Sequence, residues 1–136
     1  MKFLFKYQKH ILIIAGLINI VGAMITMISP SFFFEQFFKY PPDATYTYPY
    51  LAMYHYLFWS VVLIMGIAYW MAAVDPLKNK IVMFIGSIGK LVAVAFWIML
   101  YKQGHGNWGM LAASFEDGIM GLIMAALYWG KNPINS

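Results

Sequence analysis

The chain has 136 residues, of which 62% are hydrophobic and 10% are charged. A soluble domain normally carries about 25% charged residues, so these few charges would not cover the surface of a soluble domain of this size. The composition therefore predicts that the lipid bilayer surrounds much of the chain. A hydrocarbon core about 30 Å thick takes about 20 helical residues to cross. Four crossings and their loops use almost all of these residues, which leaves no room for a separate soluble catalytic domain.

All the basic residues are lysines, and the formal net charge is +4. The lysines flank hydrophobic runs and form no basic stripe along a polar helix, so we expect no nucleic-acid partner. The chain has no cysteine, which excludes disulfides, thiol chemistry and cysteine-bound metals.

Four hydrophobic runs predict one domain, residues 1–136, with four transmembrane helices. The spans are expected at about 11–29, 51–73, 81–101 and 109–129. Pro30 ends the first run, and Asp75-Pro76 closes the second. No small-residue cleavage pattern follows the first run, so we expect it to be a retained helix rather than a signal peptide. The predicted fold is all-α, an integral membrane antiparallel four-helix bundle.

The lysines also predict the orientation, because positive residues near span ends favour the cytoplasmic side. With the N-terminus inside, only Lys39 and Lys102 lie outside. The cytoplasmic lysines are then Lys2, Lys6, Lys9, Lys78, Lys80 and Lys131. We therefore expect both termini in the cytoplasm.

The segment 31–40 after the first span has its own pattern. Its apolar side carries Phe33, Phe34, Phe37 and Phe38, and its polar side carries Glu35, Gln36 and Lys39. This pattern is typical of a short helix in the membrane interface. Two roles fit it, an interfacial anchor and a lid over a ligand entrance.

Three charged residues lie inside the predicted spans, Lys90 on the third and Glu116 and Asp117 on the fourth. A charge at mid-helix costs about 2.5–3.5 kcal/mol on insertion scales, so such residues normally face the bundle interior and have partners. The short connection makes these two spans antiparallel neighbours, with Lys90 and the carboxylates at depths that differ by about 5 Å. Asp117 lies on a stripe of small residues, so we predict it as the first partner of Lys90. Glu116 is the alternative partner of Lys90, or else it points to His55, Trp108 or the outer water.

Small or polar residues recur at intervals of three or four on every span, and such stripes let helices approach closely in lipid. The stripes place ionisable and aromatic side chains toward one interior. The candidate binding pocket comprises Asn19, His55, Trp59, Tyr69, Lys90, Trp97, Glu116 and Asp117. The histidines lack metal-ligand spacing, and no catalytic or nucleotide-binding motif is present, so we expect neither a metal nor a cofactor. The Lys90–Asp117 pair is either a structural device that fixes helix register or part of a functional pocket.

The run from Tyr69 to Pro76, YWMAAVDP, and the run from Gly86 to Leu91, GSIGKL, resemble small four-span bacterial membrane proteins of unassigned function. These proteins are similar to the broader DoxX-like group. The resemblance covers the second half of the chain and places Lys90 and Asp117 at a lysine and an aspartate of that pattern. It implies a four-helix fold, a location in the inner membrane of a bacterium and an association with membrane oxidoreductase systems.

Three functions follow from these features. The first is a non-enzymatic bundle with a polar intramembrane site that opens to the outer side. It would be an accessory subunit of a larger membrane complex, a homo-oligomer, or a protein that binds a lipid-like small molecule. The second is an intramembrane enzyme that uses His55, Glu116 or Asp117 as acid or base on an apolar substrate. The third is a proton or ion carrier that uses Asn19 and Lys90 with Asp117.

Overall fold

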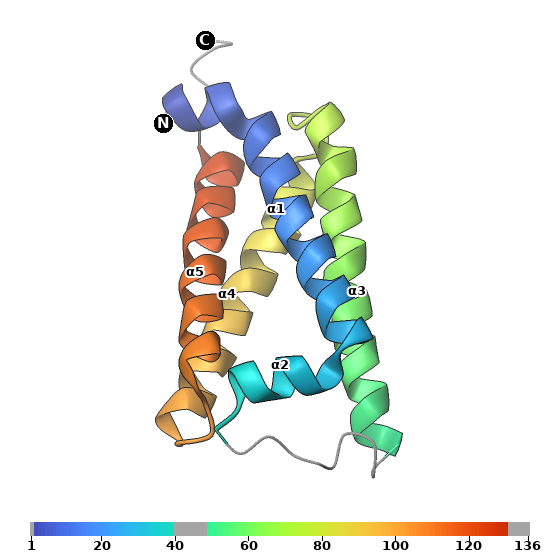
Figure 1. Cartoon of the computed structure of the whole chain (residues 1–136). Coiled ribbons are helices and arrows are strands. Elements are labelled where there is room, and N and C mark those ends of the chain that lie inside the picture. Colours follow the sequence, from blue (N-terminus) through green and yellow to red (C-terminus); the bar gives the residue numbers. More distant parts are fainter. Residues whose placement is uncertain (1, 40–48, 131–136) are drawn as a thin grey trace.

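The computed structural model describes residues 2–39 and 49–130, and they form five α-helices. These are α1 (Lys2–Ile28), α2 (Pro30–Phe37), α3 (Pro49–Val74), α4 (Lys80–Lys102) and α5 (Trp108–Trp129). By length and composition α1, α3, α4 and α5 can each cross a membrane, whereas α2 is short. The predicted all-α four-helix bundle with a short helix after the first span is therefore confirmed (Figure 1).

The helix bounds match the predicted spans closely except at the start of α1, which begins at Lys2 rather than near residue 11. Its first turns are amphipathic. Phe5 is buried among apolar side chains, while Lys6 and Lys9 are exposed. The prediction was too short because the lysines were taken as the edge of the helix, whereas they lie only on its polar face.

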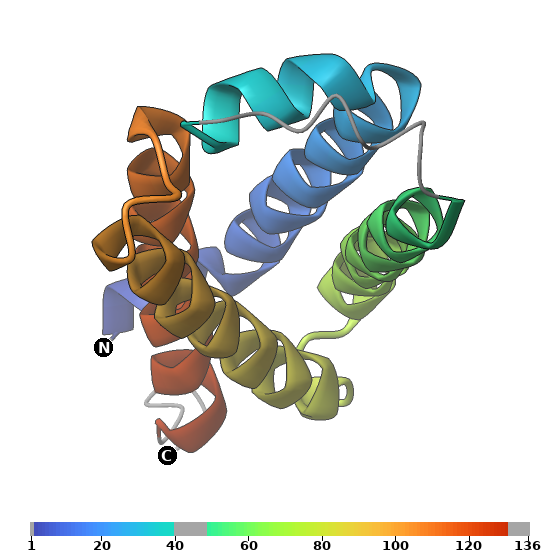
Figure 2. The ribbon, with the colours of Figure 1, turned by 90° about the horizontal axis from the view of Figure 1, so that it is seen from below.

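The long helices form two closely packed pairs, α1 with α3 and α4 with α5, and the two pairs touch each other only sparsely (Figures 1 and 2). In the first pair Gly16 and Gly66 bring the backbones together. A Cβ atom added to Gly66 would lie 2.9 Å from the carbonyl oxygen of Gly16. Beside this contact, the indole Nε1 of Trp70 donates a hydrogen bond to the carbonyl of Ile13 at 2.9 Å. Small residues allow this approach where lipid supplies no hydrophobic drive.

The second pair is joined by a short loop and also meets at small residues. A Cβ atom added to Gly121 on α5 would lie 3.1 Å from Cγ of Leu91 on α4. Ser114 satisfies its hydroxyl within α5 by donating to the carbonyl of Met110 at 2.8 Å. Its polar atom therefore needs no partner on another helix, as suits a helix in lipid.

Two hydrophobic clusters hold the pairs together, one at each end of the bundle. The termini end carries the start of α1 and the end of α5, and the other end carries α2 (Figure 1). The termini-end cluster contains Phe5, Leu12, Ala15, Tyr69, Ala72, Ala73, Met83, Met124 and Leu127. The α2-end cluster is built on Ala23, Phe33 and Trp59, with Phe37 and Trp97 among its half-buried members. Between the two clusters the middle of the bundle is less tightly filled.

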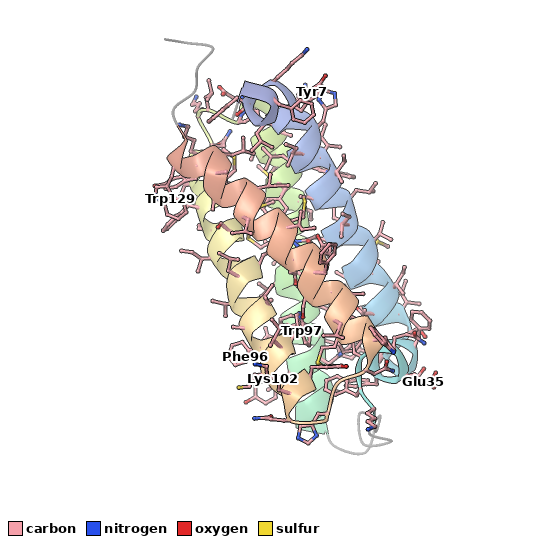
Figure 3. The ribbon with its side chains drawn as sticks, turned by 90° about the vertical axis from the view of Figure 1, so that its left-hand side faces the viewer. Tyr7, Glu35, Phe96, Trp97, Lys102 and Trp129 are labelled. Carbon is pink, nitrogen blue, oxygen red and sulfur yellow. The ribbon has the colours of Figure 1, made fainter. Side chains whose placement is uncertain are left out.

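Helix α2 lies across one end of the bundle and connects the two pairs (Figure 2). Its start continues from α1, and its end is fastened to the loop between α4 and α5. The Asn107 backbone N–H donates to the carbonyl of Phe37 at 3.0 Å, and the Asn107 amide donates to the carbonyl of Glu35 at 2.9 Å. The phenylalanine side of α2 packs on the bundle, where the Phe33 ring lies 5.1 Å from that of Trp59. Glu35 and Lys102 mark this end in Figure 3, and Tyr7 and Trp129 mark the opposite end.

The structure predicts opposite effects for two glycine-to-alanine substitutions. Gly66→Ala should lower the thermal stability of the purified protein, because the new Cβ atom would meet the Gly16 carbonyl and Ile20 Cγ1 at 2.9 and 2.7 Å. Overpacking of this kind costs about 1–3 kcal/mol. Gly22→Ala has open space around its Cβ atom and should stabilise the helix by up to about 1 kcal/mol. Thermal unfolding in detergent, followed by circular dichroism, compares the two, and equal melting temperatures would contradict this packing.

Candidate functional site

A cavity of about 400 Å³ lies between the two helix pairs. Apolar and aromatic side chains form most of its wall. It is lined by Ile18, Asn19, Gly22, Phe37, Phe58, Trp59, Val61, Val62, Met65, Tyr69, Ile85, Gly86, Gly89, Lys90, Ala93, Trp97, Ala113, Glu116 and Asp117. Cavities of about 300–1,000 Å³ with an apolar wall and a few converging polar groups are typical of small-molecule sites.

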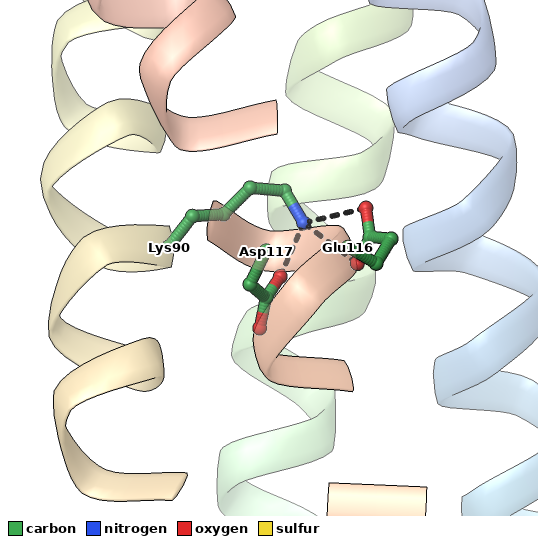
Figure 4. Close-up of polar contacts among 3 residues, drawn as sticks. All are labelled: Lys90, Glu116 and Asp117. Carbon is green, nitrogen blue, oxygen red and sulfur yellow. Dashed lines mark hydrogen bonds and ion pairs between the residues drawn. The ribbon is translucent and has the colours of Figure 1, made fainter. Parts of the chain in front are cut away.

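The polar part of the wall is a cluster of three side chains from α4 and α5 (Figure 4). The Nζ atom of Lys90 lies 2.5 Å from Oδ1 of Asp117. It also lies 3.2 and 3.4 Å from the two carboxylate oxygens of Glu116. Both carboxylates that the sequence offered as partners therefore contact the amine, and Asp117, the favoured one, lies closer. The long lysine side chain carries its amine to a position between two neighbouring carboxylates, even though these leave α5 in different directions.

This cluster lies near the middle of the bundle. Lys90 follows the first residue of α4 by ten residues and precedes the last by twelve, or roughly 15 and 18 Å along the axis. Only 6% of its surface is exposed. Charges at such a depth are stable only with partners, because hydrocarbon solvates them poorly. That the contact acts as an ion pair within a bilayer stays a prediction.

Two further polar side chains predicted for the pocket, those of Tyr69 and Asn19, line the cavity. The Tyr69 ring lies against Gly86 on α4, where an added Cβ atom would come within 2.6 Å of its Cε1 atom. Only 1% of the surface of Tyr69 is exposed. Asn19 on α1 is half-buried and lies in the same helix pair as Tyr69. The sequence did not single out Gly86 as the residue that makes room for the phenol.

Aromatic rings form the wall of the cavity toward α2. The predicted residues Trp59 and Trp97 are joined there by Phe37 and Phe58. The Phe37 ring centre lies 5.5 Å from that of Trp97, and the Phe58 ring centre lies 5.2 Å from that of Trp59. Sequence reasoning missed both phenylalanines as wall residues. The phenylalanine side of segment 31–40 was the available signal for Phe37, whereas Phe58 lies among other apolar residues and gave none.

His55 is the one predicted pocket residue that does not line the cavity. Its Nε2 atom lies 3.0 Å from the carbonyl oxygen of Thr26, near the α2 end of the bundle. Its ring packs against Phe33 and Phe34, with centres 5.5 and 5.3 Å apart. Of the two roles that the sequence allows for His55, a pocket residue or a hydrogen-bonded histidine near the bundle end, these contacts favour the second. The stripe on α3 begins at His55, and α2 packs against this residue.

The exposed part of the lining lies at the side of the bundle. Val61 on α3 is 54% exposed and Ile85 on α4 is 52% exposed. Both line the cavity, as does the exposed Gly89 on α4. The two hydrophobic clusters and α2 cover the ends. From these exposed lining residues we infer a side opening between α3 and α4, while the sequence predicts a site that opens to the outer side.

The fold and the site together define a bundle of four candidate transmembrane helices around a largely apolar cavity with one charged cluster. Comparisons with protein-family models, curated proteins and solved structures found no match to the chain. The function is therefore argued from the cavity itself.

The cluster predicts an unequal response to the loss of its members. Lys90→Met leaves two neighbouring carboxylates without a cation and should cost about 3–5 kcal/mol of stability. Asp117→Asn should cost less, because Glu116 still contacts the amine at 3.2 Å. Combining Lys90→Met with Glu116→Gln and Asp117→Asn should recover much of the loss, since no unpaired charge remains.

Thermal unfolding and purification yield in one detergent measure these effects. Glu35→Gln is the matched control, because Glu35 is exposed on α2 and removal of its charge should leave stability unchanged. If Lys90→Met were as stable as the parent chain, or if the losses simply added in the triple variant, the three side chains would not form a coupled cluster.

Proposed function

We propose that this protein binds a small, largely apolar molecule in the cavity between its two helix pairs. One observation carries the proposal, a cavity of about 400 Å³ whose wall is mainly apolar and aromatic but includes a cluster of three ionisable side chains. Polar groups that converge on one part of an apolar wall are suited to hold the polar end of an amphiphilic ligand.

The sideways opening supports a ligand that arrives from the membrane. Val61 and Ile85 are exposed at the edge of the cavity, on helices whose outer faces are apolar. A molecule dissolved in lipid tails can enter between α3 and α4 without crossing water. This favours a lipid-like ligand over a water-soluble one.

The same geometry argues against the ion-carrier hypothesis. A carrier needs polar access to both ends of the bundle, but an apolar cluster lies between the cavity and each end. The enzyme hypothesis receives no specific support from the three candidate acid–base residues, because Glu116 and Asp117 both contact Lys90 and His55 lies outside the cavity. A DoxX-like accessory subunit of a larger membrane complex is compatible with ligand binding, and no contact in the structure favours it separately.

We also propose that the chain lies in the inner membrane of a bacterium with the termini end in the cytoplasm. The exposed lysines support this orientation. Lys6 and Lys9 at the start of α1 and Lys78 in the turn between α3 and α4 belong to the termini end (Figure 1). Lys102 lies at the α2 end (Figure 3). Positive residues near span ends favour the cytoplasmic side.

Ligand binding is tested by filling the cavity without disturbing the fold. Gly22 and Gly89 line it, and a Cβ atom at either position meets nothing within 4 Å. Gly22→Leu and Gly89→Leu should therefore fold normally but lose a bound molecule that co-purifies with the parent chain. Ala95→Leu on the exposed face of α4 is the matched control and should keep it.

The measurement is native mass spectrometry of protein extracted from its own membrane, with organic extraction to identify the released molecule. The proposal predicts a molecule of defined mass in the parent and in Ala95→Leu that is depleted in both cavity-filled variants. Equal retention by all four proteins would contradict it.

The orientation is tested by single cysteines in this cysteine-free chain. In intact cells a membrane-impermeant maleimide should label Lys102→Cys but not Lys78→Cys, and both should react after the membrane is opened. Both lysines are exposed, so burial does not explain a difference. Labelling of Lys78→Cys alone in intact cells would reverse the proposed orientation.

A further inference from the structure

We infer that the ligand of the cavity is a hydrophobic cation, an apolar molecule with one positively charged group. The inference rests on the proposed function, since it assigns a chemical class to the same ligand. It follows from the formal charge of the wall, the accessibility of Glu116 and the aromatic rings.

With both carboxylates ionised, the wall of the cavity has a formal excess of one negative charge. Its charged residues are Lys90, Glu116 and Asp117, one positive and two negative side chains. One amine between two carboxylates leaves a formal charge of −1 in a setting that solvates charge poorly. A ligand with one positive charge would neutralise the site, whereas an anion would meet no free positive group.

Glu116 is the carboxylate most able to reach a ligand. Asp117 holds the closer contact with Lys90, at 2.5 Å against 3.2 Å for Glu116. The Glu116 side chain is 33% exposed and that of Asp117 is 17% exposed. Asp117 is therefore the main partner of Lys90, and Glu116 keeps part of its carboxylate open to the cavity.

The aromatic wall suits a cation in a second way. Trp59, Trp97, Phe37 and Phe58 line the cavity toward α2, and their rings contact one another. The face of an aromatic ring carries partial negative charge and attracts cations, most strongly for tryptophan. The apolar surface of a hydrophobic cation can therefore pack against the rings while its charged group contacts a carboxylate. A neutral molecule gains only the packing against the rings.

The inference is tested with three probes of the same shape and different charge. Tetraphenylphosphonium is the cation, tetraphenylborate the anion and tetraphenylsilane the neutral molecule. Each is measured by equilibrium dialysis against the full chain in nanodiscs of zwitterionic phosphatidylcholine, with Gly22→Leu nanodiscs defining binding outside the cavity. Cavity-dependent binding should be tighter for the cation than for either other probe by roughly tenfold or more.

Two charge-removing variants locate the selectivity. Glu116→Gln should weaken cavity-dependent binding of the cation by roughly tenfold, whereas Glu35→Gln, which removes a charge from the exposed side of α2, should leave it unchanged. The probe series on the unaltered chain decides the question if Glu116→Gln fails to fold.

The outcomes separate the two proposals. If the neutral probe or the anion binds in the cavity as tightly as the cation, or if a folded Glu116→Gln keeps full cation affinity, the charge assignment is overturned while ligand binding stands. If no probe distinguishes the parent from Gly22→Leu and no native ligand co-purifies, the proposed function fails as well.

Discussion

Lys90 lies near the middle of α4, an apolar helix long enough to cross a membrane, where an unpaired charge is costly. Hydrocarbon solvates a charge poorly, so α4 must present this side chain to a neighbour that carries acid groups. Glu116 and Asp117 on α5 supply them at 3.2 and 2.5 Å. Because a short loop joins the two helices, α4 and α5 pack along their length with Lys90 facing inward. The charged cluster thereby fixes which face of each helix belongs to the interior.

The second helix pair is built on different contacts, and the cavity results from this difference. Glycines hold α1 against α3, and the Trp70 indole adds a hydrogen bond to the Ile13 carbonyl. The pairs then meet only through apolar clusters at their two ends and through α2. Between the two clusters, at the level of Lys90, the small residues Asn19, Gly22 and Gly89 line the space and leave it unfilled. The two helix pairs are thus held together mainly at their ends, and the cavity lies between them at the level of Lys90.

The sequence was sufficient for those features that depend on one helix or on one short connection. Hydrophobic runs located α3, α4 and α5, and the depths of Lys90 and Asp117 followed from counting residues along neighbouring helices. It was insufficient where several elements meet. The contacts of His55 depend on α2, which packs over the end of the bundle. The contact of Lys90 with both Glu116 and Asp117 depends on the length and flexibility of the lysine side chain. The side opening depends on the distance between the two helix pairs, which the hydrophobic pattern of one helix does not predict.

Glycine has two different roles in this bundle, and the difference bears on function. At Gly66 and Gly86 a methyl group would meet a backbone carbonyl or the Tyr69 ring, so absence of a side chain serves packing. At Gly22 and Gly89 a methyl group would meet nothing, so packing does not explain the absence of a side chain. Glycine also weakens a helix by about 1 kcal/mol relative to alanine. Glycine at these two positions therefore leaves open space in the bundle and lowers the stability of the helix. In this chain that space lies beside Lys90, Glu116 and Asp117, where a bound molecule would need it.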